Sequence, residues 1–449
     1  MNKPLLSILF SFLLSVCSAQ TWSPVGSGTT FGQVESMCVY NGELYVGGYF
    51  NSMGGIPVNS LARWNGTTWD SVPGMSGFGQ IEITDMVVWQ NRLIVVGNQI
   101  HGWDGTTWSN LGGWVNAPQM SVEVFINELY ITGRFTDAAG VPTRGIAKWN
   151  GVQWDSVGGA GLNSSPGYIG RALQTYNGEL FLGGEFYSVN GAPINGVATW
   201  DGMVWDSVGN SQSTYYISCF ANRSNRIYAG GRMLIDNSWH WIGSWDGQVW
   251  DSLGIDFNSE PRAMSEYNGE LYVVGDFDSA GQQPALGIAR WNDTVWNSVG
   301  TGLDLMNINI DTVIIGVDTF YYPQEFLFAS CVYNNELYVG GFFSMIGGVP
   351  ANSIAKWHDV GATVEEAAGN NSPNVFPNPA SEMITFQFSD ARESRSIIIY
   401  DQIGREVWRE ESRENFVSVS VVEFSDGIYF YTIPKDDGSV CTGKFLIEH

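Results

Sequence analysis

One nine-residue pattern recurs along this chain and constrains its fold more than any other feature of the sequence. The first copy, at 40–48, reads Tyr-Asn-Gly-Glu-Leu-Tyr-Val-Gly-Gly, and variants occur at 91–97, 127–133, 177–184, 225–231, 268–275 and 334–341. The first five copies are each followed by Trp-Asn-Gly or Trp-Asp-Gly and then by a second Trp. Self-similarity at a period of tens of residues is the signature of a repeat architecture.

Each repeat predicts four short antiparallel strands. In the first repeat we expect strands at 37–40, 44–50, 61–64 and 67–72. Asn-Gly joins the first two strands at 41–42 and the last two at 65–66. This dipeptide favours a two-residue hairpin turn, because both central residues of the turn need a positive φ. Four antiparallel strands per repeat are typical of one blade of a β-propeller.

The chain contains seven such units, and the last of them is incomplete. The units centre on Leu44, Leu93, Leu129, Leu180, Ile227, Leu271 and Leu337. The seventh unit lacks its fourth strand, while an isolated copy of that strand, Thr-Trp-Ser-Pro-Val-Gly, stands at 21–26. We therefore predict an all-β fold, a seven-bladed β-propeller over 20–360 closed by the N-terminal strand, because closure removes the exposed edges of an open array. The Gly-Gly doublets and trailing Trp residues resemble those of kelch-type propellers.

The segments outside the repeats have other compositions. In residues 1–19, Lys3 is followed by an apolar run at 5–16 and then by small residues up to Ala19, as in a secretory signal peptide. No other stretch is long and apolar enough to suggest a transmembrane span. Residues 361–372 are small, polar and acidic, which is typical of a linker. Residues 373–449 carry short alternating runs that predict a small antiparallel β-sandwich.

A set of motifs in this C-terminal segment resembles a known family. The motifs are a Pro-Asn-Pro opening, a Tyr-Asp-x-x-Gly-Arg-x-Val centre, a Gly-x-Tyr strand and a late Lys, which place Pro377, Asn378, Pro379, Tyr400, Asp401, Gly404, Gly427, Tyr429 and Lys444. In this combination, residues 374–449 resemble the type A C-terminal sorting domain of the type IX secretion system. The sequence departs from the family at 423–426, where Glu-Phe-Ser-Asp replaces an Asp-Leu-Ser-type step.

The resemblance implies a Bacteroidota bacterium and a route of export. The chain would pass to the periplasm and then through the outer membrane by means of the type IX machinery. The sorting domain would then be removed, and the remainder would be released or attached to a surface glycolipid. The expected location is therefore outside a Gram-negative cell, as a secreted protein or on its outer surface.

Charge and reactive residues narrow the function classes. The formal net charge of −25 disfavours binding to nucleic acid or to an anionic membrane. Cys38, Cys219 and Cys331 recur at one place in their repeats, which favours buried thiols over a disulfide framework or a metal site. The sequence contains no phosphate-binding loop, serine-hydrolase elbow or zinc-protease motif, so no metal or other cofactor is expected. A Ca²⁺ site at 276–281 is the alternative, because Asp-Phe-Asp-Ser-Ala-Gly begins like a Ca²⁺ loop.

The candidate binding residues follow from the loops. On the predicted propeller we expect all the tight turns on one face and the long, varied loops on the other. Recognition usually resides on varied loops over a rigid scaffold. Near the end of each second strand one position varies. In units 1, 3, 4, 6 and 7 it precedes a recurrent aromatic residue, which is predicted to pack between blades. These positions, with one residue from the long link at 301–327, are the predicted ligand-binding set: Tyr49, Asn98, Arg134, Glu185, Arg232, Asp276, Tyr321 and Phe342. The alternative for the four charged members is a ring of salt bridges between neighbouring blades.

The sequence favours a binding or adhesion module whose varied face recognises a glycan or a protein. Two alternatives stay open. One is an extracellular propeller enzyme, a polysaccharide lyase or glycosidase, which needs two carboxylates, or a carboxylate with Tyr or Arg, to converge on one spot. The other is a purely structural surface protein. The identity of the ligand and the oligomeric state do not follow from the sequence.

Overall fold

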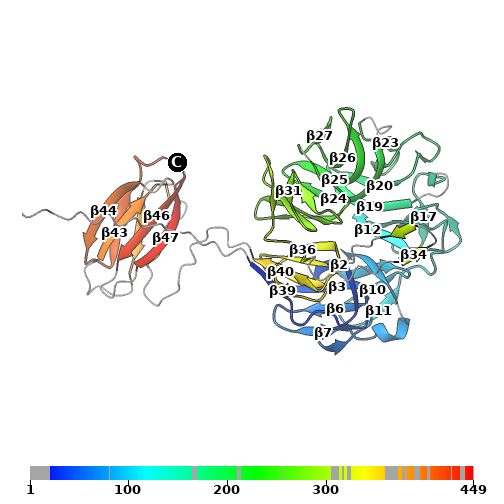
Figure 1. Ribbon diagram of the computed structural model, residues 1–449, viewed down its shortest axis with the longest axis horizontal. Coiled ribbons are helices and arrows are strands. Elements are labelled where there is room, and N and C mark those ends of the chain that lie inside the picture. Colours follow the sequence, from blue (N-terminus) through cyan, green and yellow to red (C-terminus); the bar gives the residue numbers. More distant parts are fainter. Residues whose placement is uncertain are drawn as a thin grey trace, which may run out of the picture. The chain divides into compact units, whose positions relative to one another are not determined.

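The computed structural model describes residues 21–79, 81–163, 169–209, 214–254, 256–304, 313–315, 318–320, 325–358, 373–376, 380–381, 383–388, 395–401, 405–425, 427–434 and 440–447. The expected signal peptide and linker lie outside these residues. The chain divides into two compact units, one within 19–359 and one beginning at Val360 (Figure 1). Among the described residues both units consist of β-sheets, and the short 3-10 helix η1 (Met75–Phe78) is the only helical element.

Seven four-stranded antiparallel sheets make up the N-terminal unit within the described ranges. Numbered in chain order, the first three sheets are β2 (Gly32–Tyr40), β3 (Glu43–Phe50), β6 (Leu61–Trp64) and β7 (Trp69–Ser71); β8 (Ile83–Trp89), β9 (Arg92–Gly97), β10 (His101–Trp103) and β11 (Trp108–Asn110); and β12 (Gln119–Phe125), β13 (Glu128–Gly133), β16 (Ile146–Trp149) and β17 (Trp154–Ser156). The fourth and fifth sheets are β19 (Ile169–Tyr176), β20 (Glu179–Glu185), β22 (Val197–Trp200) and β23 (Trp205–Ser207); and β24 (Thr214–Arg223), β25 (Arg226–Ile235), β26 (Ser238–Trp245) and β27 (Trp250–Ser252). The sixth and seventh sheets are β28 (Pro261–Tyr267), β29 (Glu270–Gly275), β32 (Ile288–Trp291) and β33 (Trp296–Ser298); and β36 (Phe326–Tyr333), β37 (Glu336–Phe342), β40 (Ile354–His358) and β1 (Thr21–Pro24).

The seventh sheet combines both ends of this unit. β1 pairs antiparallel with β40, so that Trp22 lies opposite Trp357 in the ladder. The two indoles have ring centroids 5.0 Å apart. The same pair of Trp residues occurs in every other sheet, for example Trp64 with Trp69 at 5.1 Å. The N-terminal strand therefore occupies the position that the fourth strand holds in the other six sheets.

The first strands of the sheets follow one another in space. Each lies beside the first strand of the next sheet, and β36 lies beside β2 (Figure 1). Hydrogen bonds repeat at these junctions: the Tyr40 hydroxyl donates to the Asn91 carbonyl in the next sheet at 2.9 Å. The Tyr333 hydroxyl makes the equivalent bond from the seventh sheet to the Gly42 carbonyl of the first sheet, at 3.0 Å. The contact between sheets seven and one is thus of the same kind as the contacts between consecutive sheets.

Hydrophobic cores lie between adjacent sheets. The aromatic residue near the end of the second strand is buried in each case where the sequence predicts packing, as in Phe135, Phe186 and Phe277. Short two-stranded ribbons fill several connections between second and third strands: β4 (Ser52–Met53) with β5 (Ile56–Pro57), β14 (Asp137–Ala138) with β15 (Val141–Pro142), β30 (Ser279–Ala280) with β31 (Gln283–Pro284), and β38 (Met345–Ile346) with β39 (Val349–Pro350). β18 (Leu162–Asn163) pairs with β21 (Ser188–Val189), and β34 (Val313–Ile315) pairs with β35 (Asp318–Phe320).

The C-terminal unit consists of two sheets with a shared core. One sheet contains β41 (Asn374–Phe376), β42 (Met383–Gln387) and β45 (Phe416–Ser420), and the other contains β44 (Glu406–Ser412), β43 (Arg395–Tyr400), β46 (Gly427–Pro434) and β47 (Val440–Ile447). Phe386 from the first sheet and Ile399, Tyr431 and Phe445 from the second belong to one buried cluster. The two sheets therefore pack face to face.

Candidate functional site

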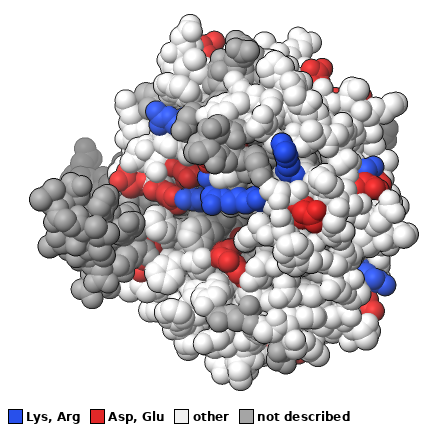
Figure 2. Space-filling model, turned by 90° about the vertical axis from the view of Figure 1, so that its right-hand side faces the viewer, with Lys and Arg blue, Asp and Glu red and all other residues white. Residues whose placement is uncertain are grey.

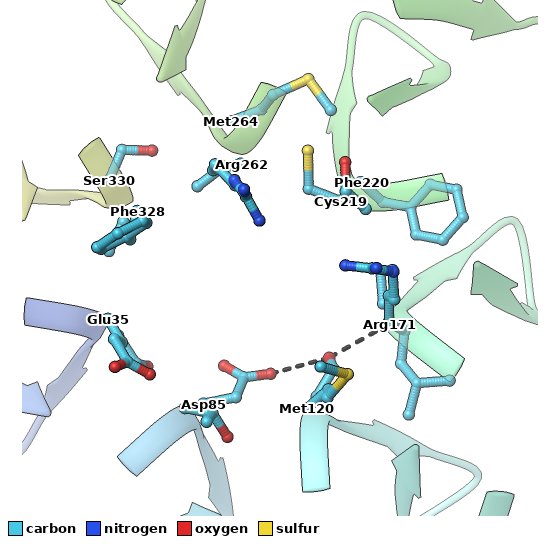
Figure 3. Close-up of a pocket in the computed structure, with 18 of the residues that line it drawn as sticks. Glu35, Asp85, Met120, Arg171, Cys219, Phe220, Arg262, Met264, Phe328 and Ser330 are labelled. Carbon is cyan, nitrogen blue, oxygen red and sulfur yellow. Dashed lines mark hydrogen bonds between the residues drawn. The ribbon is translucent and has the colours of Figure 1, made fainter. Parts of the chain in front are cut away.

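A cavity of about 250 Å³ lies where the first strands of all seven sheets meet. Each of these strands carries a β-bulge, in which one extra residue is left out of the pairing with the second strand. The seven extra residues all line the cavity, which we call the central pocket: Glu35, Thr84, Met120, Arg171, Ser218, Arg262 and Phe328. Figure 3 shows labelled members of this set directed from different strands toward a common space. The bulges therefore supply one side chain per sheet to the pocket, as bulges commonly do near functional sites.

Glycine in the second strand allows each bulge to form. On each second strand, the residue that pairs with the one just before the bulge residue is a glycine: Gly48, Gly97, Gly133, Gly184, Gly231, Gly275 and Gly341. A Cβ at these positions would lie 1.9–2.5 Å from the backbone carbonyl oxygen two residues before the bulge residue. No real Cβ tolerates such a contact. The glycine that recurs in the sequence pattern is thus required by the geometry that builds the pocket.

Two arginines form the basic side of the central pocket. Arg171 donates from Nε and Nη2 to Glu185 Oε1 at 3.0 and 2.5 Å. Arg262 donates from Nε to Asp276 at 3.1–3.2 Å and from Nη2 to Asp276 Oδ2 at 2.6 Å. Glu260 lies 3.4 Å from Arg262 Nη2. These carboxylates hold the two guanidinium groups by the same edge, and among the described residues the Nη1 atoms of both arginines have no hydrogen-bond partner.

An aromatic ring adjoins this basic side. The Arg171 guanidinium carbon lies 5.5 Å from the centre of the Tyr216 ring, within the range of a cation–π contact. Figure 3 shows the Arg171 and Arg262 side chains reaching toward the middle of the pocket from their strands. In the space-filling view of this unit, charged side chains of both signs gather near the middle of one face, and most of the rest of that face is uncharged (Figure 2).

Two carboxyl groups form the acidic side. Burial raises the pKa of Glu35 to about 7, and nearby Glu82 adds to the rise, while a hydrogen bond from Gln33 lowers it. Burial likewise raises the pKa of Asp85 to about 6, against hydrogen bonds that favour its charged form. Asp85 Oδ2 accepts from the Ser121 hydroxyl and from the Val122 amide, both at 2.9 Å, so it joins β8 to β12. Asp85 is therefore tied into the scaffold through β12, and Figure 3 shows the carboxyl groups of both Glu35 and Asp85 at the edge of the common space.

The raised pKa of Glu35 predicts a pH dependence of stability. Its folded pKa of about 7 exceeds the usual 4.5, so the folded state holds the proton more tightly and stability falls as pH rises from about 4.5 to 7. Glu35→Gln should remove this penalty and raise the free energy of unfolding at pH 8 by roughly 2 kcal/mol, after allowance for partial exposure. At pH 4 the variant and the wild type should be equally stable. Urea unfolding at both pH values measures this, with the exposed Glu266→Gln as the control. The prediction is contradicted if the stability difference between Glu35→Gln and the wild type is the same at pH 4 and at pH 8.

None of the predicted ligand-binding residues that the structure describes lines the central pocket. Of the described members, Glu185 and Asp276 bind the pocket arginines Arg171 and Arg262 directly. Asn98 lines a different cavity, next to β10. Tyr49, Arg134 and Phe342 are exposed. Arg232 lies 5.0 Å from the centre of the Trp241 ring and 5.5 Å from that of Trp239. Tyr321 lies outside the described residues.

The alternative ring of salt bridges between blades takes another form. Glu185 and Asp276 do not pair with Arg134 or Arg232 but with arginines of the first strand in their own sheets. The reason is the bulge, which turns Arg171 and Arg262 toward the ends of the neighbouring second strands. The same pairing occupies the Asp276 carboxylate, which the Ca²⁺ alternative needs as a ligand. Within the described residues no group of three or more His, Cys, Asp or Glu side chains is placed to hold a metal ion.

The pocket residues themselves escaped the sequence analysis. Glu35, Arg171 and Arg262 stand just before the most regular part of each repeat and have different identities from unit to unit. The signal that could have found them is the recurrent second glycine of the pattern, because a glycine in a strand interior often marks a bulge on the paired strand. Counting back from the hairpin turn to the residue opposite that glycine locates the extra residue.

The three thiols whose side chains the structure describes are shielded and unpaired. Cys38, Cys219 and Cys331 are free, with Cys219 buried and the other two half-buried. Burial raises the pKa of each thiol to about 12, so these cysteines are poor nucleophiles at neutral pH. Only Cys219 lines the central pocket, where its low reactivity makes it a packing residue.

The motif residues of the C-terminal unit take structural positions in its sheets. Tyr400 ends β43, and Asp401 follows it and accepts hydrogen bonds from the Arg405 amide and Nε at 2.9 and 3.0 Å. Gly427 begins β46, and the buried Tyr429 donates its hydroxyl to the Ser425 carbonyl at 3.0 Å. Lys444 lies in β47. Pro377, Asn378, Pro379 and Gly404 are outside the described residues.

Solved structures with similarity to this chain are remote. PorZ of Porphyromonas gingivalis, an essential bacterial surface component of the type-IX secretion system, matches with 12% identity and a TM-score of 0.36, over 93% of this chain and 66% of PorZ. The extracellular domain of a protein described as a hybrid two-component system of B. thetaiotaomicron matches with 10% identity and a TM-score of 0.36, over 93% of this chain and 68% of that one. The chain thus spans just under two thirds of the length of PorZ. No curated protein matches the sequence.

The C-terminal segment matches a family directly. Residues 374–448 match the family model of the secretion system C-terminal sorting domain, which confirms the resemblance to the type IX sorting domain. A domain of this kind is the part of a chain that interacts with the type IX machinery. The described part of the chain contains no helix that is long and apolar enough to cross a membrane. Residues 374–448 are therefore a secretion system C-terminal sorting domain, and the chain is exported to the cell surface.

Proposed function

We propose that the N-terminal unit is a closed seven-bladed β-propeller that binds an acidic glycan, or an acidic segment of a protein, in its central pocket. Three contacts support closure: the pairing of β1 with β40, the Tyr333 hydrogen bond to the first sheet, and the contact of β36 with β2. In this proposal the propeller spans 20–360 and resembles kelch-type propellers, a signal peptide precedes it, and 361–372 links it to the sorting domain at 373–449. After removal of that domain, the propeller of this Bacteroidota protein is released or attached to a surface glycolipid.

The observation that carries the ligand class is the pair of pocket arginines. Glu185 and Asp276 fix Arg171 and Arg262 by one edge, which reduces the conformational entropy that a ligand would otherwise have to remove. Their Nη1 atoms have no partner among the described residues and are available to a carboxylate or sulfate oxygen. Hydrogen bonds between charged groups contribute more than neutral ones, about 1.5–3 kcal/mol each.

The varied positions named from the sequence become the outer part of this site. Tyr49, Arg134, Arg232 and Phe342 lie on the surface near the ends of their second strands. The Arg232 guanidinium carbon lies 5.0 Å from the centre of the Trp241 ring and 5.5 Å from that of Trp239, and Trp239 is half exposed. A chain-like ligand held by its acid group in the pocket could extend over these residues. This arrangement keeps both ligand types predicted from the sequence, a glycan and a protein.

Arg171→Ala and Arg262→Ala are expected to weaken binding of acidic glycans at least about tenfold each, since each removes a charged hydrogen-bond donor. Binding should also weaken as salt concentration rises. An array of sulfated and uronic-acid oligosaccharides, followed by calorimetry on the bound ones, measures this with the full chain. Arg92→Ala is the matched control, because Arg92 is exposed and outside the pocket. Acidic-glycan binding that survives both pocket substitutions would overturn the proposal.

An enzyme is the second candidate, favoured by Glu35. A carboxyl group with a pKa near 7 suits a general acid, and it shares the pocket with two arginines that could hold an acidic sugar. Release of reducing or unsaturated ends from acidic polysaccharides would assign the chain to this class, provided that Glu35→Gln abolishes release and preserves binding. Binding without product assigns the chain to the binding modules, and absence of any ligand favours the structural surface protein.

A further inference from the structure

A second cavity, of about 470 Å³, lies beside the second sheet. It is formed where the connection from β9 to β10 meets the link from β11 to β12. Its wall contains Asn98, Gln99, His101, Asn110, Trp114 and Gln119, and none of its lining residues carries a formal charge at neutral pH when His101 is uncharged. We call it the amide cavity. It shares no lining residue with the central pocket.

The polar groups of the amide cavity are of two kinds. Asn98, Gln99 and Asn110 are exposed amides, and each can donate and accept hydrogen bonds. His101 and Gln119 are buried behind them, with 4% and 0% exposure. His101 stacks on Phe78 at 3.9 Å between ring centroids, and burial lowers its pKa, so the imidazole is neutral.

The two buried residues each leave an acceptor unused. His101 Nε2 donates to Gln99 Oε1 at 2.8 Å, which leaves Nδ1 as an acceptor. The Gln119 amide nitrogen donates to the Ala117 carbonyl at 2.6 Å, and Gln119 Oε1 is left as another acceptor. Neither acceptor has a hydrogen-bond partner among the described residues. Both atoms are shielded from solvent within the wall of the cavity.

An indole is presented at the edge of this cavity. Trp114 is 68% exposed, which is unusual for the largest apolar side chain. Its backbone is nevertheless fixed, because the Trp114 carbonyl accepts from the Ala139 amide at 2.7 Å and Val115 bridges to Ala138. The backbone that carries the exposed ring is thus held in place by the β14–β15 ribbon.

We propose that the amide cavity binds a neutral saccharide unit. The C–H face of a sugar ring would lie against the Trp114 indole, and its hydroxyls would bond to Asn98, Gln99 and Asn110. No lining residue carries a positive charge, so an anionic ligand would meet no compensating cation there. The volume falls within the range of about 300–1,000 Å³ that is typical of ligand pockets. The chain would then carry a neutral sugar site next to the acidic-ligand site proposed above.

The experiment compares substitutions in the two cavities on the full chain. The probes are neutral oligosaccharides of glucose, galactose, mannose and N-acetylglucosamine, at millimolar concentration, with binding followed by saturation-transfer NMR and calorimetry. Trp114→Ala and Asn110→Ala are each expected to weaken binding at least about tenfold. Phe31→Ala is the matched control, because Phe31 is 69% exposed and lies outside both cavities. A thermal melt of each variant shows whether it is folded.

The outcomes separate this inference from the proposed function. Loss of neutral-sugar binding in Trp114→Ala, with retention in Arg171→Ala and insensitivity to salt, supports a separate neutral site. Absence of neutral-sugar binding by the wild type, or equal binding by wild type and Trp114→Ala, overturns it. Loss in Arg171→Ala alone would also overturn it, because the sugars would then occupy the central pocket. Failure of acidic glycans to bind would affect only the central-pocket proposal.

Discussion

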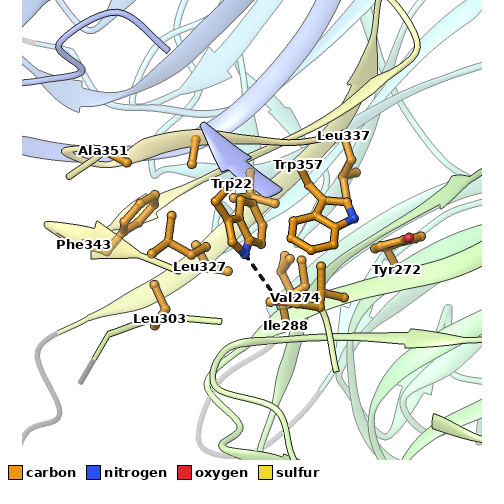
Figure 4. Close-up of a cluster of buried hydrophobic side chains, with 14 of the residues drawn as sticks. Trp22, Tyr272, Val274, Ile288, Leu303, Leu327, Leu337, Phe343, Ala351 and Trp357 are labelled. Carbon is orange, nitrogen blue, oxygen red and sulfur yellow. Dashed lines mark hydrogen bonds between the residues drawn. The ribbon is translucent and has the colours of Figure 1, made fainter. Parts of the chain in front are cut away.

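Trp22→Ala is expected to lower the free energy of unfolding of the N-terminal unit by about 3–5 kcal/mol, as for other buried Trp truncations. Trp22 is 6% exposed and belongs to a core cluster that also contains Leu327, Phe343 and Trp357 (Figure 4). Its indole nitrogen donates to the Val299 carbonyl at 3.3 Å (Figure 4). The substitution therefore leaves a cavity between the sixth and seventh sheets and weakens the strand that completes the seventh.

Chemical denaturation followed by Trp fluorescence measures this effect. Trp114→Ala is the matched control, because the same side chain is removed from an exposed position and the stability should change by less than about 0.5 kcal/mol. A loss below about 1 kcal/mol for Trp22→Ala would mean that the N-terminal strand is not needed to hold the seventh sheet, and it would count against the closed propeller.

Gly184→Ala is expected to destabilise the unit by about 3 kcal/mol or more and to impair the central pocket. The added Cβ would lie 2.1 Å from the Ile169 carbonyl oxygen and 2.8 Å from the Gly170 Cα. Both neighbours are backbone atoms of β19, so relief requires the bulge at Arg171 to shift. The pocket would then lose the fixed position of Arg171, and affinity for an acidic ligand should fall with stability.

Urea unfolding midpoints and the acidic-glycan assay test this second expectation together. Gly77→Ala is the control, because a Cβ at Gly77 meets no atom within 4 Å and the residue needs no positive φ. A Gly184→Ala protein with wild-type stability would show that the bulge adapts freely. Wild-type ligand affinity despite lower stability would show that Arg171 does not depend on the bulge for its position.

The strands that were located best from the sequence are the nearly continuous apolar runs next to the tight turns. The third strand of the first repeat, expected at 61–64, is β6 at Leu61–Trp64, and the second, expected at 44–50, is β3 at Glu43–Phe50. The first strand was expected at 37–40 but extends from Gly32. Its earlier half contains the bulge and polar side chains that face the pocket, so the alternation that marks a strand is lost there. The residues that build the pocket are thus the same residues that make the first half of this strand difficult to recognise in the sequence.

The residues of the candidate site could likewise be predicted only in part from the sequence. Glu185 and Asp276 could be named from the sequence because they vary beside a recurrent aromatic, but their partners could not. The partners lie 14 residues earlier, on the neighbouring strand. Asn98 was named for the varied face, yet it lines the amide cavity, which depends on Trp114 in a link of no regular pattern. The first pairing depends on a bulge that changes which side chains meet across the two strands, and the second depends on a link that has no register to read.

By itself, the sequence determined the repeated four-strand unit, the spare N-terminal strand and the sorting domain, because each depends on local turn residues, alternation or a family motif. Only the tertiary structure decided which side chains converge. The bulges bring one residue from each first strand to a common centre, and carboxylates of the second strands then fix Arg171 and Arg262 there. Convergence of this kind sums small displacements over seven sheets, so it exists only once the sheets have packed against one another.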